Sequence, residues 1–373
     1  MFTQKDQLKF EIISKVVAGL IDSKLAAQAL HVSYRTIGRY KKGFLKKGST
    51  FLFHGNRGRT SHNATSAEVK EKIINQLIEK YFDFSISHAW EKLKEDDLQI
   101  VGYKTLLRWC HEKKYIKRMR RRKKIHRMRA RMPRIGMMLL MDGSYDSWYG
   151  NQKSCLIAAV DDANNEIPYA EFFDSESTLS CMKVIQKIIE TKGIFDILYV
   201  DKAGVFGGNK RQDFCQVEEA CKVMGIQIIY AHTAEAKGRI ERLWRTLQGR
   251  LIPEMRLANI QTRKQANKYL QEYFLPNEYD PKFIKTPTSN QSNYKVNFRN
   301  DLKEIFCKKE YRTIKSDQTF NYASDTYLIN KFMGNLKGKL VQIRTYQDGS
   351  IQFFWADKIL DVIKFDGRIS EAA

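Results

Sequence analysis

The sequence predicts a multidomain protein: N-terminal all-α helix-turn-helix units, a central α/β domain and a small C-terminal β-barrel. Three observations support this. Apolar residues recur at helical spacing through residues 8–116, strand-like runs alternate with helical segments through residues 135–280, and short alternating runs with glycine turns follow residue 300. At 373 residues, the chain is also too long for one ordinary domain.

The composition indicates a cytoplasmic protein that binds a polyanion. The formal net charge is +23, and nucleic acid is the usual partner for so large an excess. No apolar stretch is long enough to span a bilayer, and the first ten residues lack the apolar segment of a signal peptide. The six cysteines are scattered without a CxxC pair, which indicates reduced thiols rather than disulfides or a zinc site.

Residues 1–50 are predicted to form a helix-turn-helix DNA-binding domain. Two helical segments, LKFEIISKVVAGL and SKLAAQAL, precede a short break and the basic segment YRTIGRYKKGFLKKG, which Ser33 is placed to cap. A basic amphipathic helix pair with solvated Lys and Arg explains the pattern equally well. The candidate DNA contacts near the leading end of the basic helix are Tyr34, Arg35, Thr36 and Arg39.

Residues 62–116 are predicted to form a second helical, helix-turn-helix-like domain, joined to the first by a segment rich in Gly, Ser, Asn and Thr. Its three helical segments start near Ser66, near Ser85 and at GYKTLLRWC. The apolar residues of the last segment are mainly those expected in a hydrophobic core, which favours a structural role for this segment. The candidate DNA contacts in this unit are Tyr103, Lys104 and Arg108.

Residues 117–134 form a basic linker with eleven Lys or Arg and no acid. Such a run repels itself, so it is either a flexible tail or a phosphate-binding strap. Its position between the helical units and the α/β region favours the strap. The candidate DNA contacts here are Arg120, Arg121, Arg122, Lys123 and Lys124.

Residues 135–280 predict three antiparallel strands at GMMLLMDGSY, SCLIAAVDDA and EIPYAEFF, followed by helix, strand, helix, strand and a long helix from about Ala236. This is the ribonuclease H-like order of elements. Residues 300–373 predict short strands with Gly338 and Asp348-Gly349 turns, hence the β-barrel; this part is also suited to an RNA or protein contact.

Three acids occupy positions suited to phosphodiester chemistry. Asp142 follows the buried-type run MMLLM, Asp201 ends the run FDILYVD, and Glu241 lies early in the long helix. Two divalent ions ~4 Å apart, held by carboxylates, can clamp the attacking and the leaving oxygen of a phosphodiester. Each acid alone has an ordinary explanation in a turn, a loop or a surface ion pair. The set of three, in this order on these elements, indicates a metal site.

Other polar residues near these positions have competing explanations. Asp161 and Asp162 lie in the turn DDANNE, where turn geometry explains them. Asp146 either touches a metal or shapes a hairpin turn. Glu235 precedes the long helix and suits its N-terminal dipole, and His232 at a strand end is more often structural.

The chain resembles the integrase-type catalytic core of bacterial insertion-sequence transposases, and the ISNCY-type group most closely. The matching stretches, which span essentially the whole chain, are MDGSYDSWYG, VDDANNE, SEST, VDKAGVF, CKVMGIQIIYAHTAEAKGRIERLWRTLQGRL and YRTIKSDQTFNYASDTYLI. The stretch KGRIERLWRTLQ is the most specific, because it looks like the segment that carries the family's glutamate. On this resemblance Asp142, Asp201 and Glu241 match the DDE triad, with 58 and 39 residues between successive members.

The resemblance implies a transposase that binds the terminal inverted repeats of an insertion sequence and catalyses Mg²⁺-dependent 3′-end cleavage and strand transfer. It implies two Mg²⁺ ions, replaceable by Mn²⁺, at the triad, and double-stranded DNA from the transposon ends and the target as partner. A homo-oligomer on DNA in the bacterial cytoplasm, at the nucleoid, is also implied. Lys237, Arg242 and Arg245 are expected to hold phosphates.

The chain departs from the group at Asp146, where histidine is common, and at Thr233-Ala234-Glu235, where a serine-proline-glutamine run is common. Two other functions remain open. A non-catalytic helix-turn-helix regulator needs only the helical units and the basic linker. In that case the presence of all three acids of the triad would be accidental. A junction resolvase shares the fold but has no need of two leading DNA-reading units.

Overall fold

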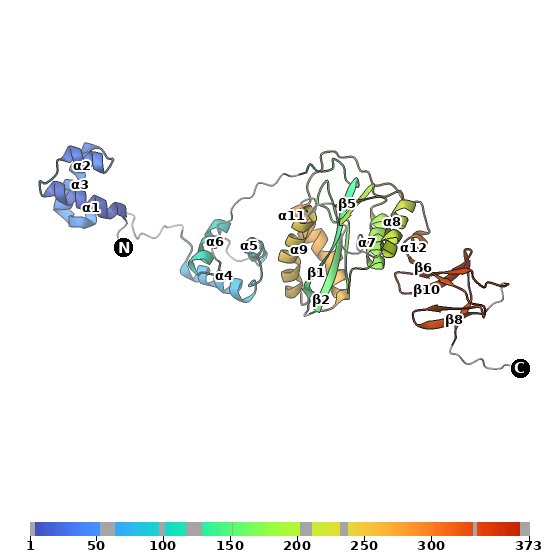
Figure 1. The fold of residues 1–373 in the computed structure, drawn as a ribbon. Helices are drawn as coiled ribbons and strands as arrows, with labels where there is room; N and C mark the ends of the chain where they lie inside the picture. The colour runs from blue at the N-terminus through green and yellow to red at the C-terminus, as the bar shows by residue number, and fades with distance from the viewer. Residues whose placement is uncertain are drawn as a thin grey trace. The chain divides into compact units, whose positions relative to one another are not determined.

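The computed structural model describes residues 4–52, 64–96, 101–116, 129–150, 152–201, 211–231, 238–330 and 334–365 (Figure 1). The chain divides into two compact units, Met1–Lys72 and Ile73–Ala373. No helix among the described residues is long and apolar enough to cross a membrane. The described cysteine side chains, at positions 110, 155, 181, 221 and 307, are buried free thiols, as predicted.

The first unit contains the three predicted helices, α1 (Gln4–Val17), α2 (Ser23–Ala29) and α3 (Tyr34–Lys47), followed by the 3₁₀-helix η1 (Gly48–Leu52). Ser33 caps α3 by accepting a hydrogen bond from the backbone N–H of Thr36, which confirms the predicted start of that helix. The helices close around a small apolar core made of Ile13, Val16, Ala26, Ile37 and Leu52.

Three further helices follow: α4 (Ala67–Glu79), α5 (Ile86–Glu95) and α6 (Tyr103–Glu112). Ser66 and Ser85 accept backbone hydrogen bonds at the starts of α4 and α5, as the sequence predicts. Leu106 and Trp109 of α6 are buried, so the core interpretation of these residues is confirmed.

The central domain is a five-stranded sheet in the order β3-β2-β1-β4-β5. Its strands are β1 (Met138–Tyr149), β2 (Gln152–Asp161), β3 (Tyr169–Phe173), β4 (Ile197–Asp201) and β5 (Gln227–Ala231). The first three form an antiparallel meander, and β4 and β5 continue parallel to β1. This is the predicted ribonuclease H-like order.

Helices cover both faces of the sheet. Residues of α7 (Thr178–Thr191) and α8 (Arg211–Val223) share one apolar core with Leu139 and Met141 of β1. Residues of α9 (Gly238–Leu257), α10 (Arg263–Tyr269) and the π-helix η3 (Leu270–Tyr279) share the other with Met138 and Leu140. Alternate residues of β1 therefore serve opposite cores, as the two-residue period of a strand requires.

The segment after α11 (Asp280–Phe283) includes KTPTSNQSNY, which has the composition of a linker, but it is held against the α/β domain. Ile135 bridges to Ser292 and Ile194 to Lys295, so the segment runs along the α/β domain. The short helix α12 (Leu302–Ile305) adds Leu302 and Ile305 to the core beneath α7 and α8. The segment lacks apolar periodicity because it is held by backbone bridges rather than by an apolar face.

The C-terminal strands form two sheets around one apolar core. One is ordered β11-β10-β9-β6 and the other β12-β8-β7. The strands are β6 (Lys308–Thr313), β7 (Thr319–Tyr322), β8 (Asp325–Ile329), β9 (Leu340–Thr345), β10 (Ile351–Trp355), β11 (Lys358–Ile359) and β12 (Val362–Lys364). The predicted β structure is confirmed, and closure of these sheets into a barrel stays a prediction.

Candidate functional site

Two of the three predicted acids lie on neighbouring parallel strands. The last parallel pair between β1 and β4 joins Leu140 with Tyr199, and Asp142 and Asp201 each come two residues later. Side chains two residues apart on a strand point to the same face of the sheet. Since Leu140 and Tyr199 pack in the core beneath α9, both acids belong to the face that α9 covers.

The third acid, Glu241, lies in the first turn of α9 and is exposed. One turn further on, the indole Nε1 of Trp244 donates a hydrogen bond to Oδ2 of Asp142 over 3.0 Å. The helix α9 docks on the sheet through an apolar stripe of Ile240, Leu243, Leu247 and Leu251, which are all buried. The structure thus fixes the beginning of α9 against the strand that carries Asp142.

The cations predicted around this site are in part described. Arg242 and Arg245 are exposed on α9, next to Glu241 and one turn after it. Lys237, with His232 and Glu235, falls in residues 232–237, outside the described residues, and residues 202–210 after Asp201 do so as well.

The turn acids have larger structural roles than turn geometry alone. Asp161 is buried, and its carboxylate accepts the backbone N–H groups of Gly136 and Ala163. Burial is the main cause that raises the pKa of Asp161, to about 6. Asp146 accepts the backbone N–H of Ser147 over 2.7 Å, which fits the turn-shaping interpretation.

Asp162 anchors the end of the basic linker. Its buried carboxylate pairs with Arg129 and Arg239 and accepts the backbone N–H of Met132. Arg131 donates to the carbonyl oxygen of Asp162. The linker therefore ends in a protein-bound segment that also touches the start of α9, while Arg120 to Lys124 lie outside the described residues.

Among the described residues, the potential metal ligands whose atoms the structure brings within 4.8 Å of one another are not Asp142, Asp201 and Glu241 but a group between α5, α9 and η3. One ligand atom each from His88, Glu254 and Glu278 lies within 4.8 Å of the others, and all three side chains are buried. The ammonium of Lys92 is already there, 2.9 Å from Glu254 and 2.6 Å from Glu278. A cation would have to displace Lys92, so this group is an ion-pair network rather than a metal site.

More ion pairs join the same helices, and sequence reasoning missed them all. The carboxylate of Glu91 in α5 accepts hydrogen bonds from both terminal guanidinium nitrogens of Arg250 and also forms an ion pair with Lys282. Burial favours a raised pKa for Glu91, but the two cations outweigh it and lower the pKa to about 2. Arg256 of α9 makes a second two-point contact with Asp83. The second helical segment is thus bound to the central domain.

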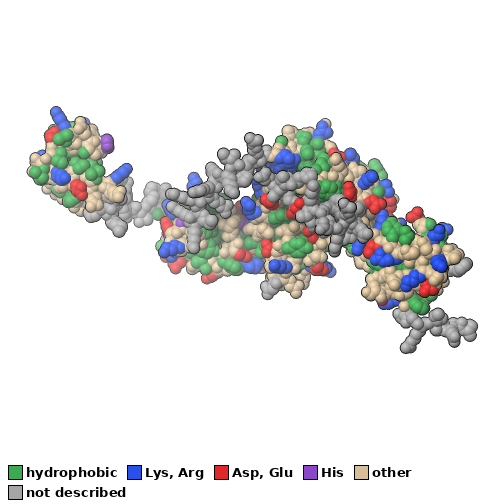
Figure 2. All heavy atoms as spheres, in the orientation of Figure 1, with side chains coloured by type: hydrophobic (Ala, Val, Ile, Leu, Met, Phe, Trp, Pro, Cys, Tyr) green, Lys and Arg blue, Asp and Glu red, His purple; other side chains and the backbone are tan. Residues whose placement is uncertain are grey.

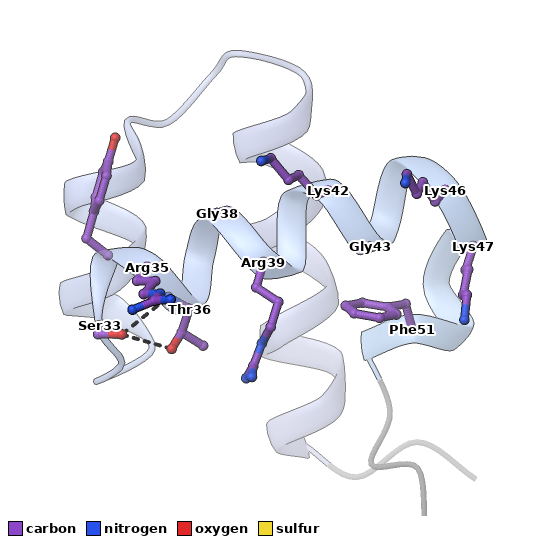
Figure 3. A pocket seen from close by; sticks show the side chains of 11 residues that line it. Ser33, Arg35, Thr36, Gly38, Arg39, Lys42, Gly43, Lys46, Lys47 and Phe51 are labelled. Atoms are coloured by element: carbon purple, nitrogen blue, oxygen red, sulfur yellow. Dashed lines mark hydrogen bonds between the residues drawn. The ribbon is translucent and has the colours of Figure 1, made fainter.

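The helix α3 presents a basic stripe opposite its buried side. Ile37 faces the core, while Arg35, Arg39, Lys42 and Lys46 are exposed at i, i+4, i+7 and i+11 spacing. Figure 3 shows Arg39, Lys42 and Lys46 projecting from this helix. All three are among the residues that line an open groove of about 860 Å³. The predicted contacts Tyr34, Arg35, Thr36 and Arg39 line the groove; Lys42, Lys46 and Lys47 add to them.

The candidates in α6 form a weaker set. Tyr103 packs edge-on against Trp90, with ring centroids 5.9 Å apart, and Arg108 pairs with Glu112. Lys104 is exposed. On the face drawn in Figure 2, Lys and Arg side chains are spread over the surface of the described parts of the chain, in line with the net charge of +23.

Comparison with known proteins gives a consistent answer. The chain is 28% identical over 384 residues to a protein of Sinorhizobium fredii (strain NBRC 101917 / NGR234) named "Putative transposase y4bF". The match covers 100% of this chain and 84% of that protein. The chain is similar to transposases over its whole length. The transposase for insertion sequence IS1202 of Streptococcus pneumoniae is 29% identical over 307 residues, 71% of this chain and 66% of that transposase. The resemblance to transposases inferred from the sequence is therefore confirmed.

Two solved structures show weaker likeness. The HTLV-2 integrase catalytic core domain in complex with magnesium is 16% identical, with a TM-score of 0.30, and the match covers 38% of this chain and 89% of that one. The simian T-cell lymphotropic virus intasome in complex with PP2A regulatory subunit B56 gamma is 13% identical, with a TM-score of 0.34. The match covers 70% of this chain and 92% of that one. At these scores the fold assignment rests on strand order and register. No protein-family model matches the chain.

Proposed function

We propose that the chain is a DDE transposase that binds the terminal inverted repeats of an insertion sequence and catalyses 3′-end cleavage and strand transfer. One observation carries the proposal: Asp142 and Asp201 occupy matching positions on parallel strands, on the face covered by the helix that carries Glu241. The whole-length similarity to transposases supports it.

The three acids suit a divalent cation. The set contains only carboxylates, which are the hard oxygen ligands that Mg²⁺ and Mn²⁺ prefer. The group around His88 differs, because it includes an imidazole and the ammonium of Lys92 already lies within it. Asp142, Asp201 and Glu241 would together hold the two Mg²⁺ ions. Such a pair, when bound, lowers the pKa of the attacking water and stabilises the leaving 3′-oxygen.

The residues around the acids have DNA-holding roles in this proposal. Arg242 and Arg245 are exposed on the Glu241 end of α9, where they are placed to hold phosphates close to the acids. Lys237 and the strap residues Arg120 to Lys124 are proposed to do the same. After cleavage, the freed 3′-hydroxyl attacks a phosphodiester of the target, forms a new P–O bond and displaces the target strand's 3′-oxygen, which leaves as a 3′-hydroxyl. No covalent link between protein and DNA forms.

The first unit is the proposed reader of the terminal repeat. A capped helix with a solvent-facing basic stripe fits the major groove, whose width admits an α-helix. Tyr34, Arg35, Thr36 and Arg39 at its leading end are the proposed base contacts, and Lys42 and Lys46 the proposed phosphate contacts. Tyr103, Lys104 and Arg108 of α6 are proposed as additional contacts. Two transposon ends must be joined, so a homo-oligomer on DNA is expected.

A nicking assay with added Mg²⁺ tests the proposal. The substrate is a duplex that carries the inverted repeat found in the DNA flanking the gene. Cleavage at the 3′ end of the repeat should rise with Mg²⁺ and stop when EDTA removes it. Specific binding without cleavage at every Mg²⁺ concentration would instead favour the helix-turn-helix regulator.

Replacing Gly38 by Ala tests the α3 surface with two effects of opposite sign. A Cβ at this exposed position meets nothing within 4 Å. Since glycine inside a helix costs ~1 kcal/mol relative to alanine, Gly38→Ala should raise the stability of the first unit. We expect it to weaken binding to the repeat, because glycine admits DNA close to the backbone of α3. Thermal unfolding and fluorescence anisotropy measure the two effects.

Gly43 supplies the control for this prediction. A Cβ there collides with the ring of Phe51, so Gly43→Ala should lower stability. If Gly38→Ala raises stability and leaves DNA affinity unchanged, DNA does not approach α3 at this position.

A further inference from the structure

We propose that Trp244 is a positioning residue that sets the orientation of the Asp142 carboxylate for divalent-cation binding. This inference rests on the proposed function. The indole Nε1 of Trp244 donates to Asp142 Oδ2 over 3.0 Å, and the two residues come from different elements, α9 and β1. The bond therefore sets the orientation of the Asp142 carboxylate relative to α9, which carries Glu241 one turn before Trp244.

The donor is itself held in place by packing. The Trp244 side chain is 8% exposed and lies in the apolar core beneath α9. Its ring meets that of Trp148 in a T-shaped arrangement, with centroids 6.3 Å apart. Trp148 is 1% exposed, and its own Nε1 donates to the carbonyl oxygen of Ser144 over 2.9 Å. Packing of the buried Trp244 ring against its apolar neighbours, the ring at position 148 among them, thus sets the direction of the Trp244 N–H bond.

The chemistry of indole suits this task. Its N–H is a donor only, so it offers no atom that competes with Asp142 for a cation. Groups that hydrogen-bond to a metal-binding carboxylate orient it, and their loss typically lowers metal affinity or activity by about 10- to 100-fold. Trp244 acts through Asp142 and is not placed to touch DNA phosphates or the reacting atoms, since it is buried.

Mn²⁺ binding to the full chain, measured by electron paramagnetic resonance without DNA, tests the proposal. Trp244→Phe keeps a buried aromatic ring and removes the donor, and Trp244→Leu removes the donor with different packing. Trp148→Phe is the matched control. It also removes an indole N–H from this pair of rings, but that N–H donates to the backbone carbonyl of Ser144 and not to Asp142. Asp142→Asn reports on the site itself.

We expect both Trp244 variants to bind Mn²⁺ about 10- to 100-fold more weakly than the unaltered chain, with the Mg²⁺ needed for half-maximal nicking raised in parallel. Trp148→Phe should keep the affinity of the unaltered chain, even where its thermal stability falls. Trp244 variants that bind Mn²⁺ as tightly as Trp148→Phe overturn the inference. Equal Mn²⁺ binding by Asp142→Asn and the unaltered chain overturns the proposed metal site instead.

Discussion

Asp142→Asn is expected to reduce cleavage of terminal-repeat DNA by about 10³-fold or more, equivalent to ~4 kcal/mol of lost transition-state stabilisation. The amide keeps the size of the side chain and an oxygen that can accept the Trp244 N–H, but it removes the charge that would hold the cations. Binding of the repeat should be unchanged, because Asp142 is not among the proposed DNA contacts, and the proposed base contacts lie on α3 in the first unit. Single-turnover nicking and anisotropy measure the two properties on the same preparation.

Asp146→Asn is the matched control for this prediction. It lies four residues further along β1 and removes the same charge, but its carboxylate accepts only a local backbone N–H among its described hydrogen bonds, that of Ser147. Nicking by this variant should stay close to that of the unaltered chain. Equal losses in the two variants would mean that any negative charge on this strand matters, and the assignment of Asp142 would be wrong.

Lys92→Met is expected to destabilise the unit of residues 73–373 by ~3–5 kcal/mol, because two buried carboxylates lose its ammonium. Among the described residues, Glu254 then keeps only His88 as a partner, and Glu278 keeps only Lys282. Burial disfavours the ammonium, but its hydrogen bonds to Glu278 and Glu254 outweigh burial and raise the pKa of Lys92 well above its usual value. The lysine thus stays charged throughout the physiological range, and its contribution is lost only as the pH rises through the raised pKa. The unfolding free energy in urea at pH 7 measures the loss.

Lys94→Met controls for loss of a positive charge from the same helix. Lys94 is exposed and lies over the ring of Trp90 at 3.6 Å, an interaction worth only ~0.5–1 kcal/mol at an exposed site. A similar loss of stability in both variants would show that the buried network adds nothing beyond ordinary surface charge.

Local patterns in the sequence were sufficient to predict the elements that frame the site. The buried run before Asp142 and the run ending in Asp201 predicted strands that the structure pairs in register. The apolar stripe of α9 predicted which side of that helix meets the sheet. Each of these patterns reflects which residues are buried, and burial of one face of a helix or strand produces a periodic pattern of apolar residues in the sequence.

Contacts between distant segments left no such trace. The pairs Arg250–Glu91 and Trp244–Asp142 join residues more than a hundred positions apart, and a single charge or indole carries no sign of its partner. The sequence of strand β6, KKEYRT, lacks the apolar alternation from which a strand can be predicted. The π-helix η3 includes Pro276, a residue that ordinarily argues against a helix.

The most direct test of the account is an anomalous diffraction map from crystals of the full chain soaked in Mn²⁺. The account predicts anomalous density bounded by the carboxylates of Asp142, Asp201 and Glu241, and its loss in Asp142→Asn crystals. Density at His88, Glu254 and Glu278 with none at the three acids would contradict it.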